Sequence, residues 1–258
     1  MFTSNPFAVL SESIPPSAIQ AYVGVMIALV VGGTLFDVWH KGSATYFFSS
    51  WRNSRDKGTQ KVGGGKILSL AIQTALVEVL TSAEFGLGRR RVAHLLTMYG
   101  FLFYVVTTVV MVFCPAAATP AVLPQLWIAG ALLVCLGGYW FWFFIRVDVS
   151  AEGHTPFRIM RADLFILSLL ATTSLGLIWA TLQSVESWGT YIVLVLYLIA
   201  TTVLFGAVPW SKFSHMFFKP AAAFEKRVSE AAGSRSNLPA PADKPETLGS
   251  ARERPRHY

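Results

Sequence analysis

Five histidines are the side chains of this sequence best suited to redox chemistry, and two of them adjoin long apolar stretches. His94 lies at the start of one such stretch, and His215 lies just after another. A neutral imidazole is a good axial ligand for haem iron, and two imidazoles leave the iron no open position for a substrate. A haem held in this way carries electrons rather than activating oxygen. The pair predicts one b-type haem, with two polar residues at helix ends as the alternative.

The remaining histidines are weaker candidates for ligation. His40 lies three residues after Asp37, about one helical turn away, so the carboxylate could orient its ring. His40 could equally be a polar residue of the membrane interface. His154 lies in a loop, and His257 lies next to the last residue of the chain. Only His40 joins His94 and His215 as a candidate cofactor-binding residue.

Several cations lie close to the two histidines in sequence or at the same ends of apolar stretches. Arg91 ends a run of three arginines before His94, Arg146 follows an apolar stretch, and Lys212 precedes His215. Arginine and lysine bind carboxylates through charge-assisted hydrogen bonds, so these three cations could hold haem propionates. The arginine run could also set the membrane topology and contact anionic lipid.

Other cofactor and catalytic motifs are absent from the sequence. Cys114 and Cys135 both lie in apolar stretches and form no CxxC or CxxCH pattern. This argues against a disulfide framework, a cysteine-ligated iron–sulfur cluster and a c-type haem. No phosphate-binding loop, HExxH motif or nucleophile motif is present either. We therefore expect a subunit that carries electrons rather than an enzyme that catalyses alone.

The elements that must position these residues are helices in a membrane. Of the 258 residues, 53% are hydrophobic and 14% are charged, whereas a soluble domain has about 25% charged residues. A helix needs about 20 apolar residues to cross the hydrocarbon core. Five stretches reach about this length: 19–36, 92–113, 121–145, 164–182 and 191–209. They predict an all-α fold, a bundle of five transmembrane helices within residues 19–219.

The basic residues predict how this bundle is oriented. All 21 Lys and Arg fall within 41–91, 146–161 and 212–258. With the N-terminus outside, five spans place every one of them on the cytoplasmic face, as the positive-inside rule requires. We therefore expect a multi-pass protein of the bacterial cytoplasmic (inner) membrane, with residues 1–18 in the periplasm. We expect these cations to lie next to the lipid bilayer, and we expect no nucleic-acid partner.

Two further segments lie on the cytoplasmic side of this prediction. Residues 67–80 are too short for a span and include Gln73 and Glu78, which favours an amphipathic interfacial helix. Residues 220–258 are rich in Pro, Ala, Ser and charge, which predicts a disordered tail.

Three short motifs resemble a known family. The sequences RRRVAHLL at 89–96, RADLF at 161–165 and SKFSHM at 211–216 resemble the membrane subunits of the respiratory nitrate reductase gamma family. The resemblance implies that His94 and His215 ligate a b haem near the cytoplasmic face. That family commonly has a second histidine pair deeper in the membrane, where this chain has Tyr104 and Tyr197. We expect the two tyrosines to pack inside the bundle, which leaves one haem.

The resemblance also implies partners. The chain has no fused iron–sulfur domain, so a separate cytoplasmic iron–sulfur or flavin oxidoreductase would exchange electrons with it and the quinone pool. HKGS at 40–43 and YFF at 46–48 look most like the membrane anchor associated with adenylylsulfate (APS) reductase, an enzyme of sulfur metabolism. One haem near the cytoplasm implies electroneutral transfer. The alternative is a haem-free anchor that recruits a soluble enzyme, and a small transporter would need a more polar interior.

Overall fold

A computed structural model describes residues 4–40, 42–82, 88–114, 119–146, 155, 157–185, 187–210 and 215–234. All regular secondary structure within these ranges is helical. The predicted all-α fold is confirmed for this part of the chain.

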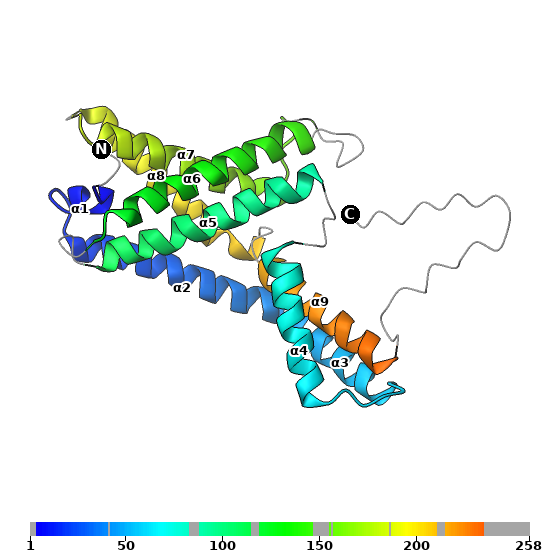
Figure 1. Cartoon of the computed structure of the whole chain (residues 1–258). Helices are drawn as coiled ribbons and strands as arrows, with labels where there is room; N and C mark the ends of the chain where they lie inside the picture. Colours follow the sequence, from blue (N-terminus) through cyan, green and yellow to red (C-terminus); the bar gives the residue numbers. More distant parts are fainter. Residues whose placement is uncertain are drawn as a thin grey trace.

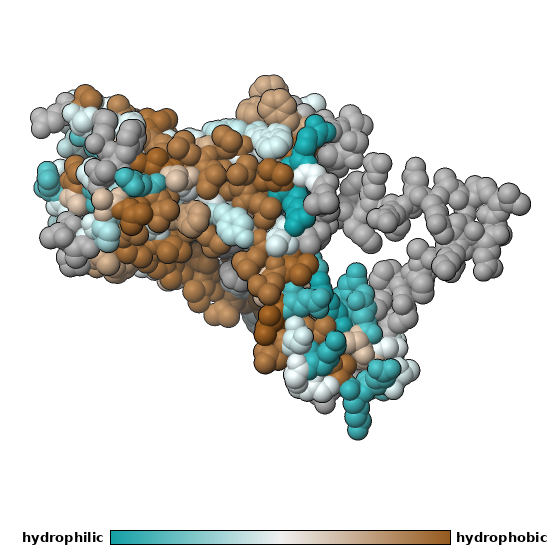
Figure 2. Space-filling model, viewed as in Figure 1, coloured by the Kyte–Doolittle hydropathy of each residue, from teal (hydrophilic) through white to brown (hydrophobic). Residues whose placement is uncertain are grey.

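Five helices are long and apolar enough to cross a membrane, as predicted. They are α2 (Pro16–His40), α5 (Arg89–Phe113), α6 (Val122–Trp140) with the π-helical turn Phe141–Ile145 that continues it, α7 (Leu164–Leu182) and α8 (Trp188–Gly206). The five run side by side along the length of the molecule (Figure 1). Apolar side chains cover much of the outer surface of the bundle in Figure 2, as expected for helices that face lipid.

The closest pair of spans is α5 and α6, and glycines make this approach possible. A Cβ atom added to Gly100 would lie 2.7 Å from the carbonyl oxygen of Gly130, and one added to Gly137 would lie 2.6 Å from that of Ala93. These separations are too short for any side chain, so the two backbones pack directly against each other. Small residues play this part in membrane bundles because apolar surface alone does not drive helix association in lipid.

The buried side chains form two groups along the bundle axis. One group surrounds Tyr104, Tyr197, Trp127 and Trp179 and extends to Phe7 of the short helix α1 (Pro6–Leu10). The other consists of Phe101, Val134, Leu169, Leu204 and Val208. The first group fills the half of the bundle near α1, and the second fills part of the other half.

Three helices gather at the end of the bundle opposite α1 (Figure 1). They are α3 (Ser43–Asp56), α4 (Gly64–Thr74) with the π-helical turn Ala75–Leu80, and α9 (His215–Ala232). Because consecutive spans alternate in direction, the three cation-bearing segments all start from this end, which we call the basic end. Hydrophilic residues cover much of α3 and α9 in Figure 2.

The prediction of a disordered tail over 220–258 is corrected for residues 220–232, which belong to α9. This helix continues through Pro220 to Ala232, and Val228, Ser229 and Ala232 are buried. The Phe224 ring packs on Trp51 of α3 with 5.5 Å between centroids. Composition suggested disorder, but alanine has the highest helix propensity, and the apolar residues of this segment share one face. Residues 235–258 lie outside the described part.

Candidate functional site

His94 lies in the second turn of α5, on the side of the helix that faces α7 and α8. Residues seven apart share a helical face, so His94 lies two turns from Phe101 on the same side. Phe101 is buried, and its ring centroid lies 6.4 Å from that of Phe165 of α7 and 6.5 Å from that of Phe205 of α8. His94 therefore lies on the same side of α5 as a layer of three phenylalanine rings, two helical turns closer to the start of the helix.

The segment before α5 is tied to the first turns of that helix by three side chains. Ser82 Oγ lies 3.1 Å from His94 Nδ1, Arg91 Nε donates to the Thr81 carbonyl at 2.7 Å, and the Tyr99 hydroxyl donates to the Leu80 carbonyl at 2.6 Å. Ser82 is buried and has a φ of +47°, in the left-handed region. Its neighbours therefore fix the position of its hydroxyl beside His94.

The contact of Ser82 with His94 bears on metal binding. Imidazoles that ligate a metal usually donate the other ring N–H to an oxygen, which sets the tautomer and the ring orientation. In the tautomer whose Nδ1–H donates to Ser82 Oγ, the lone pair is on Nε2. Sequence reasoning missed Ser82, because nothing in the sequence indicates that residues 80–82 fold back onto α5.

The structure places the backbone of His215 and not its imidazole. His215 is the first residue of α9; its side chain and the whole of Lys212 lie outside the described part of the chain. The chain approaches this point through Val208 and Pro209, which pack where Gly33 of α2 carries no side chain. His154 and His257 also lie outside the described ranges.

His40 and Arg146 differ in their surroundings, since His40 is exposed at the end of α2 and Arg146 is buried at the end of α6. The His40 side chain is exposed at the end of α2 and stacks on Phe36, with 5.4 Å between ring centroids. Arg146 is buried and forms an ion pair with Asp163, with 2.6 Å between Nη2 and Oδ2. It also donates to the carbonyls of Thr155 and Arg158.

These contacts engage the Arg146 guanidinium that we expected to hold a propionate. Its guanidinium lies 4.2 Å from the centroid of the Trp142 ring, and its nitrogens already donate to a carboxylate and two carbonyls. The Asp163 carboxylate in turn accepts from the Met160 backbone N–H at 2.8 Å. Arg146 therefore fastens the segment before α7 to the end of α6.

Tyr104 and Tyr197 pack inside the bundle, as expected. The Tyr104 hydroxyl donates to the Tyr197 hydroxyl at 2.9 Å, and the two rings stack on Trp127 and Trp179 at centroid distances of 5.0 and 5.8 Å. All four side chains are buried. These rings therefore fill the space between α5 and α8 at this level of the bundle.

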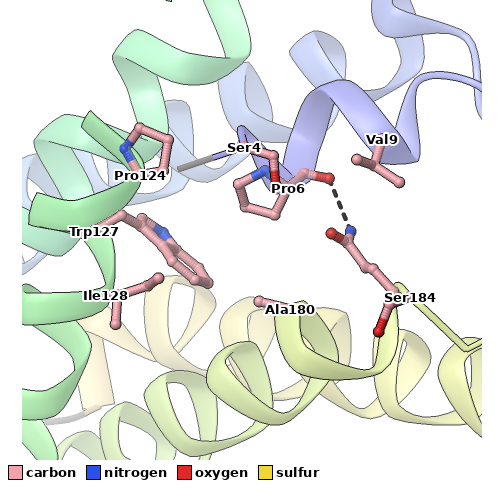
Figure 3. Close-up of a pocket in the computed structure, with 9 residues that line it drawn as sticks. Ser4, Pro6, Val9, Pro124, Trp127, Ile128, Ala180 and Ser184 are labelled. Atoms are coloured by element: carbon pink, nitrogen blue, oxygen red, sulfur yellow. Dashed lines mark hydrogen bonds between the residues drawn. The ribbon is translucent and has the colours of Figure 1, made fainter. Parts of the chain in front are cut away.

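The α1 end carries a feature that sequence reasoning missed. Phe7 of α1 inserts between the rings of Trp127 and Trp179, at centroid distances of 5.9 and 5.8 Å. The Gln183 amide donates to the Pro6 carbonyl at 2.8 Å, drawn as the dashed line in Figure 3. Beside it lies a pocket of about 300 Å³. The signal was the dipeptide Asn5–Pro6, an N-cap followed by proline in the first turn.

The described geometry thus brings His94, Ser82 and Arg91 together at the basic end and assigns Arg146 to a structural contact. Comparison of the chain with protein-family models, with curated proteins and with solved structures found no match.

Proposed function

We propose that this chain is a b-type cytochrome subunit that anchors a soluble oxidoreductase to the membrane and carries electrons between it and the quinone pool. His94 and His215 are the proposed axial ligands of one haem b. The observation that carries the proposal is the setting of His94, whose imidazole lies on the inward side of α5 with Ser82 Oγ 3.1 Å from Nδ1. A haem with two imidazole ligands supplies one-electron transfer without substrate binding at the iron.

The chain's own residues have distinct parts in this proposal. His94 and His215 would hold the iron, and Ser82 is a positioning residue that orients the His94 ring. Arg91 and Lys212 are the candidate partners for propionates, while Arg146 is left out because Asp163 occupies it. The layer of Phe101, Phe165 and Phe205 would keep water out of the side of the site toward the membrane interior.

The proposed partner is a cytoplasmic iron–sulfur or flavin enzyme that docks at the basic end. The resemblance of residues 40–48 suggests adenylylsulfate reductase as a candidate. The orientation follows from the cations at this end, which the positive-inside rule assigns to the cytoplasm of a bacterium. With one haem near the cytoplasmic face and quinone reached from the membrane, the proposed transfer is electroneutral.

A haem-free anchor is the second candidate, and the dense packing of the bundle favours it. The half of the bundle near α1 is filled by buried aromatic rings, and Phe101 also belongs to a buried group. In this candidate the basic end recruits the soluble enzyme, and His94 serves only to hold Ser82 and the segment before α5.

An absorption spectrum of the purified full chain separates the two candidates. We expect a reduced α-band typical of low-spin b haem after dithionite, and its loss in both His94→Ala and His215→Ala. His40→Ala is the matched control and should keep the band, because His40 is exposed. A colourless protein that still binds its partner would establish the haem-free anchor instead.

Ser82→Gly tests the positioning residue. Glycine suits the left-handed backbone at this position, so the variant removes the hydroxyl with little strain. Loss of the hydrogen bond lowers the basicity of the imidazole, so the haem should remain bound with a higher midpoint potential. An unchanged potential would mean that Ser82 serves only the fold.

A further inference from the structure

The α4 segment exposes a row of apolar side chains from Leu68 to Leu80. The segment comprises α4 and the π-helical turn that follows it, so it runs from Gly64 to Leu80. Four side chains at intervals of four residues are exposed at relative accessibilities of 44 to 63%: Leu68, Ile72, Leu76 and Leu80. We call these four residues the α4 stripe.

The π-helical turn keeps this stripe straight. In an α-helix each step of four residues passes a full turn by roughly 40°, so a stripe with this spacing drifts around the helix. A π-helical turn contains more residues, because its hydrogen bonds join residues five apart. The turn Ala75–Leu80 therefore brings Leu76 and Leu80 back into line with Leu68 and Ile72.

The opposite face of the segment packs against protein and contains its one carboxylate. Leu70 and Thr74 are buried. Glu78 Oε1 lies 2.8 Å from Arg227 Nη2 of α9, in an ion pair whose two side chains are partly exposed. The acidic residue that made 67–80 a poor membrane span is thus turned away from the stripe.

The position of the segment relative to the spans identifies what meets the stripe. In Figure 1, α4 lies across the direction of the five spans at the basic end. In Figure 2, the apolar surface of the bundle continues onto the side of α4 that is turned toward the bundle. Hydrophilic residues cover the opposite side. Phe36 and Trp39 are exposed on the last turns of α2 at the same end, as is typical of side chains at a membrane interface. A bilayer that surrounds the spans would therefore reach the stripe.

We infer that the α4 segment lies in the plane of the membrane at the basic end, with the α4 stripe inserted among the lipid acyl chains. The other side of the segment carries α3 and α9, through Arg227 and the buried side chains of α9. The three helices thus form a platform seated on the leaflet, with exposed cations such as Arg52 and Lys226 on its aqueous side. This inference does not depend on haem binding.

Depth-dependent fluorescence quenching of the full chain in lipid nanodiscs tests the inference. In a background with Cys114→Ser and Cys135→Ala, one cysteine is introduced as Ile72→Cys or Leu76→Cys and labelled with a fluorophore. Val106→Cys, on the exposed face of span α5, is the control for lipid, and Arg52→Cys on α3 is the control for water. Gln73→Cys is the matched position, one residue away from the stripe on the same exposed helix.

We expect brominated lipids to quench the labels at 72 and 76 to an extent close to that at 106, and iodide in the buffer to quench them little. The label at 73 should respond less to brominated lipid than its neighbour at 72. Strong quenching by iodide at 72 and 76 would overturn the inference, because the stripe would face water. Protection from both quenchers would also overturn it, because protein rather than lipid would then cover the stripe.

Discussion

The hydroxyl of Tyr104 on α5 donates a 2.9 Å hydrogen bond to the hydroxyl of Tyr197 on α8, in the half of the bundle nearer α1. Both rings are buried, and each stacks on a tryptophan. This contact fills the interior between the two spans at the level where the family that the motifs resemble commonly has a second histidine pair. In the proposed cytochrome we therefore expect one haem, at the basic end, and electroneutral transfer.

Removing the acceptor of this hydrogen bond should destabilise the bundle without affecting the proposed haem. Tyr197→Phe deprives the buried Tyr104 hydroxyl of its partner, and losing such a bond costs about 1–3 kcal/mol. Thermal unfolding in detergent should show a lower midpoint, whereas Tyr191→Phe, at an exposed position of the same helix, should change it little. If Tyr197→Phe instead abolished the haem band, Tyr197 would belong to the cofactor site.

Breaking the contact between Arg146 and Asp163 should lower the thermal stability of the chain. We expect a larger loss here than from substitution of any other charged residue described above. Arg146→Met leaves the Asp163 carboxylate buried without its cation, and breaking a buried pair costs roughly 3–5 kcal/mol. The measurement is the thermal midpoint in detergent. Arg146→Lys should recover only part of the loss, because one ammonium group cannot donate to the carboxylate and both carbonyls in the same geometry.

The haem content of the same variants distinguishes a structural role from a cofactor role. If Arg146 fastens the segment before α7, the fraction that remains folded should keep the b-haem band. A protein of unchanged stability that had lost the band would contradict this assignment. That result would return Arg146 to the set of propionate partners.

The five spans could be predicted because each depends on local composition and length. The gathering of the cations at one end could be predicted from their positions in the sequence. Because consecutive helices alternate in direction, alternate connections lie on the same side. The role of Arg146 could not be predicted, because its partner Asp163 and the two carbonyls are supplied by a segment that folds back from α7. The contact of His94 with Ser82 escaped prediction for the same reason, and α9 was missed because its buried face exists only against α3 and α4.

A methyl group at Gly100 should weaken the packing of α5 on α6. The added Cβ atom would lie 2.7 Å from both the Gly130 oxygen and the Val134 nitrogen, and backbone atoms cannot move aside as a flexible side chain can. We expect Gly100→Ala to cost about 1–3 kcal/mol, in the range of overpacked cores. Gly24→Ala is the control, because no atom lies within 4 Å of a Cβ at that position of α2. Equal thermal midpoints for the two variants would show that the helices separate at little cost.

Truncation of Phe7 should release α1 from the end of the bundle. The ring is buried between Trp127 and Trp179, and loss of a buried phenylalanine side chain costs on the order of 3 kcal/mol. Since α1 has only five residues, the loss should appear as local opening rather than global unfolding. Hydrogen exchange of the backbone amides of Ala8 and Val9 should therefore accelerate in Phe7→Ala, whereas Val9→Ala, at an exposed position of the same helix, should leave the Ala8 amide protected. Unchanged exchange in Phe7→Ala would mean that the bonds of Asn5 to Met111 and of Gln183 to Pro6 are sufficient to hold α1 in place.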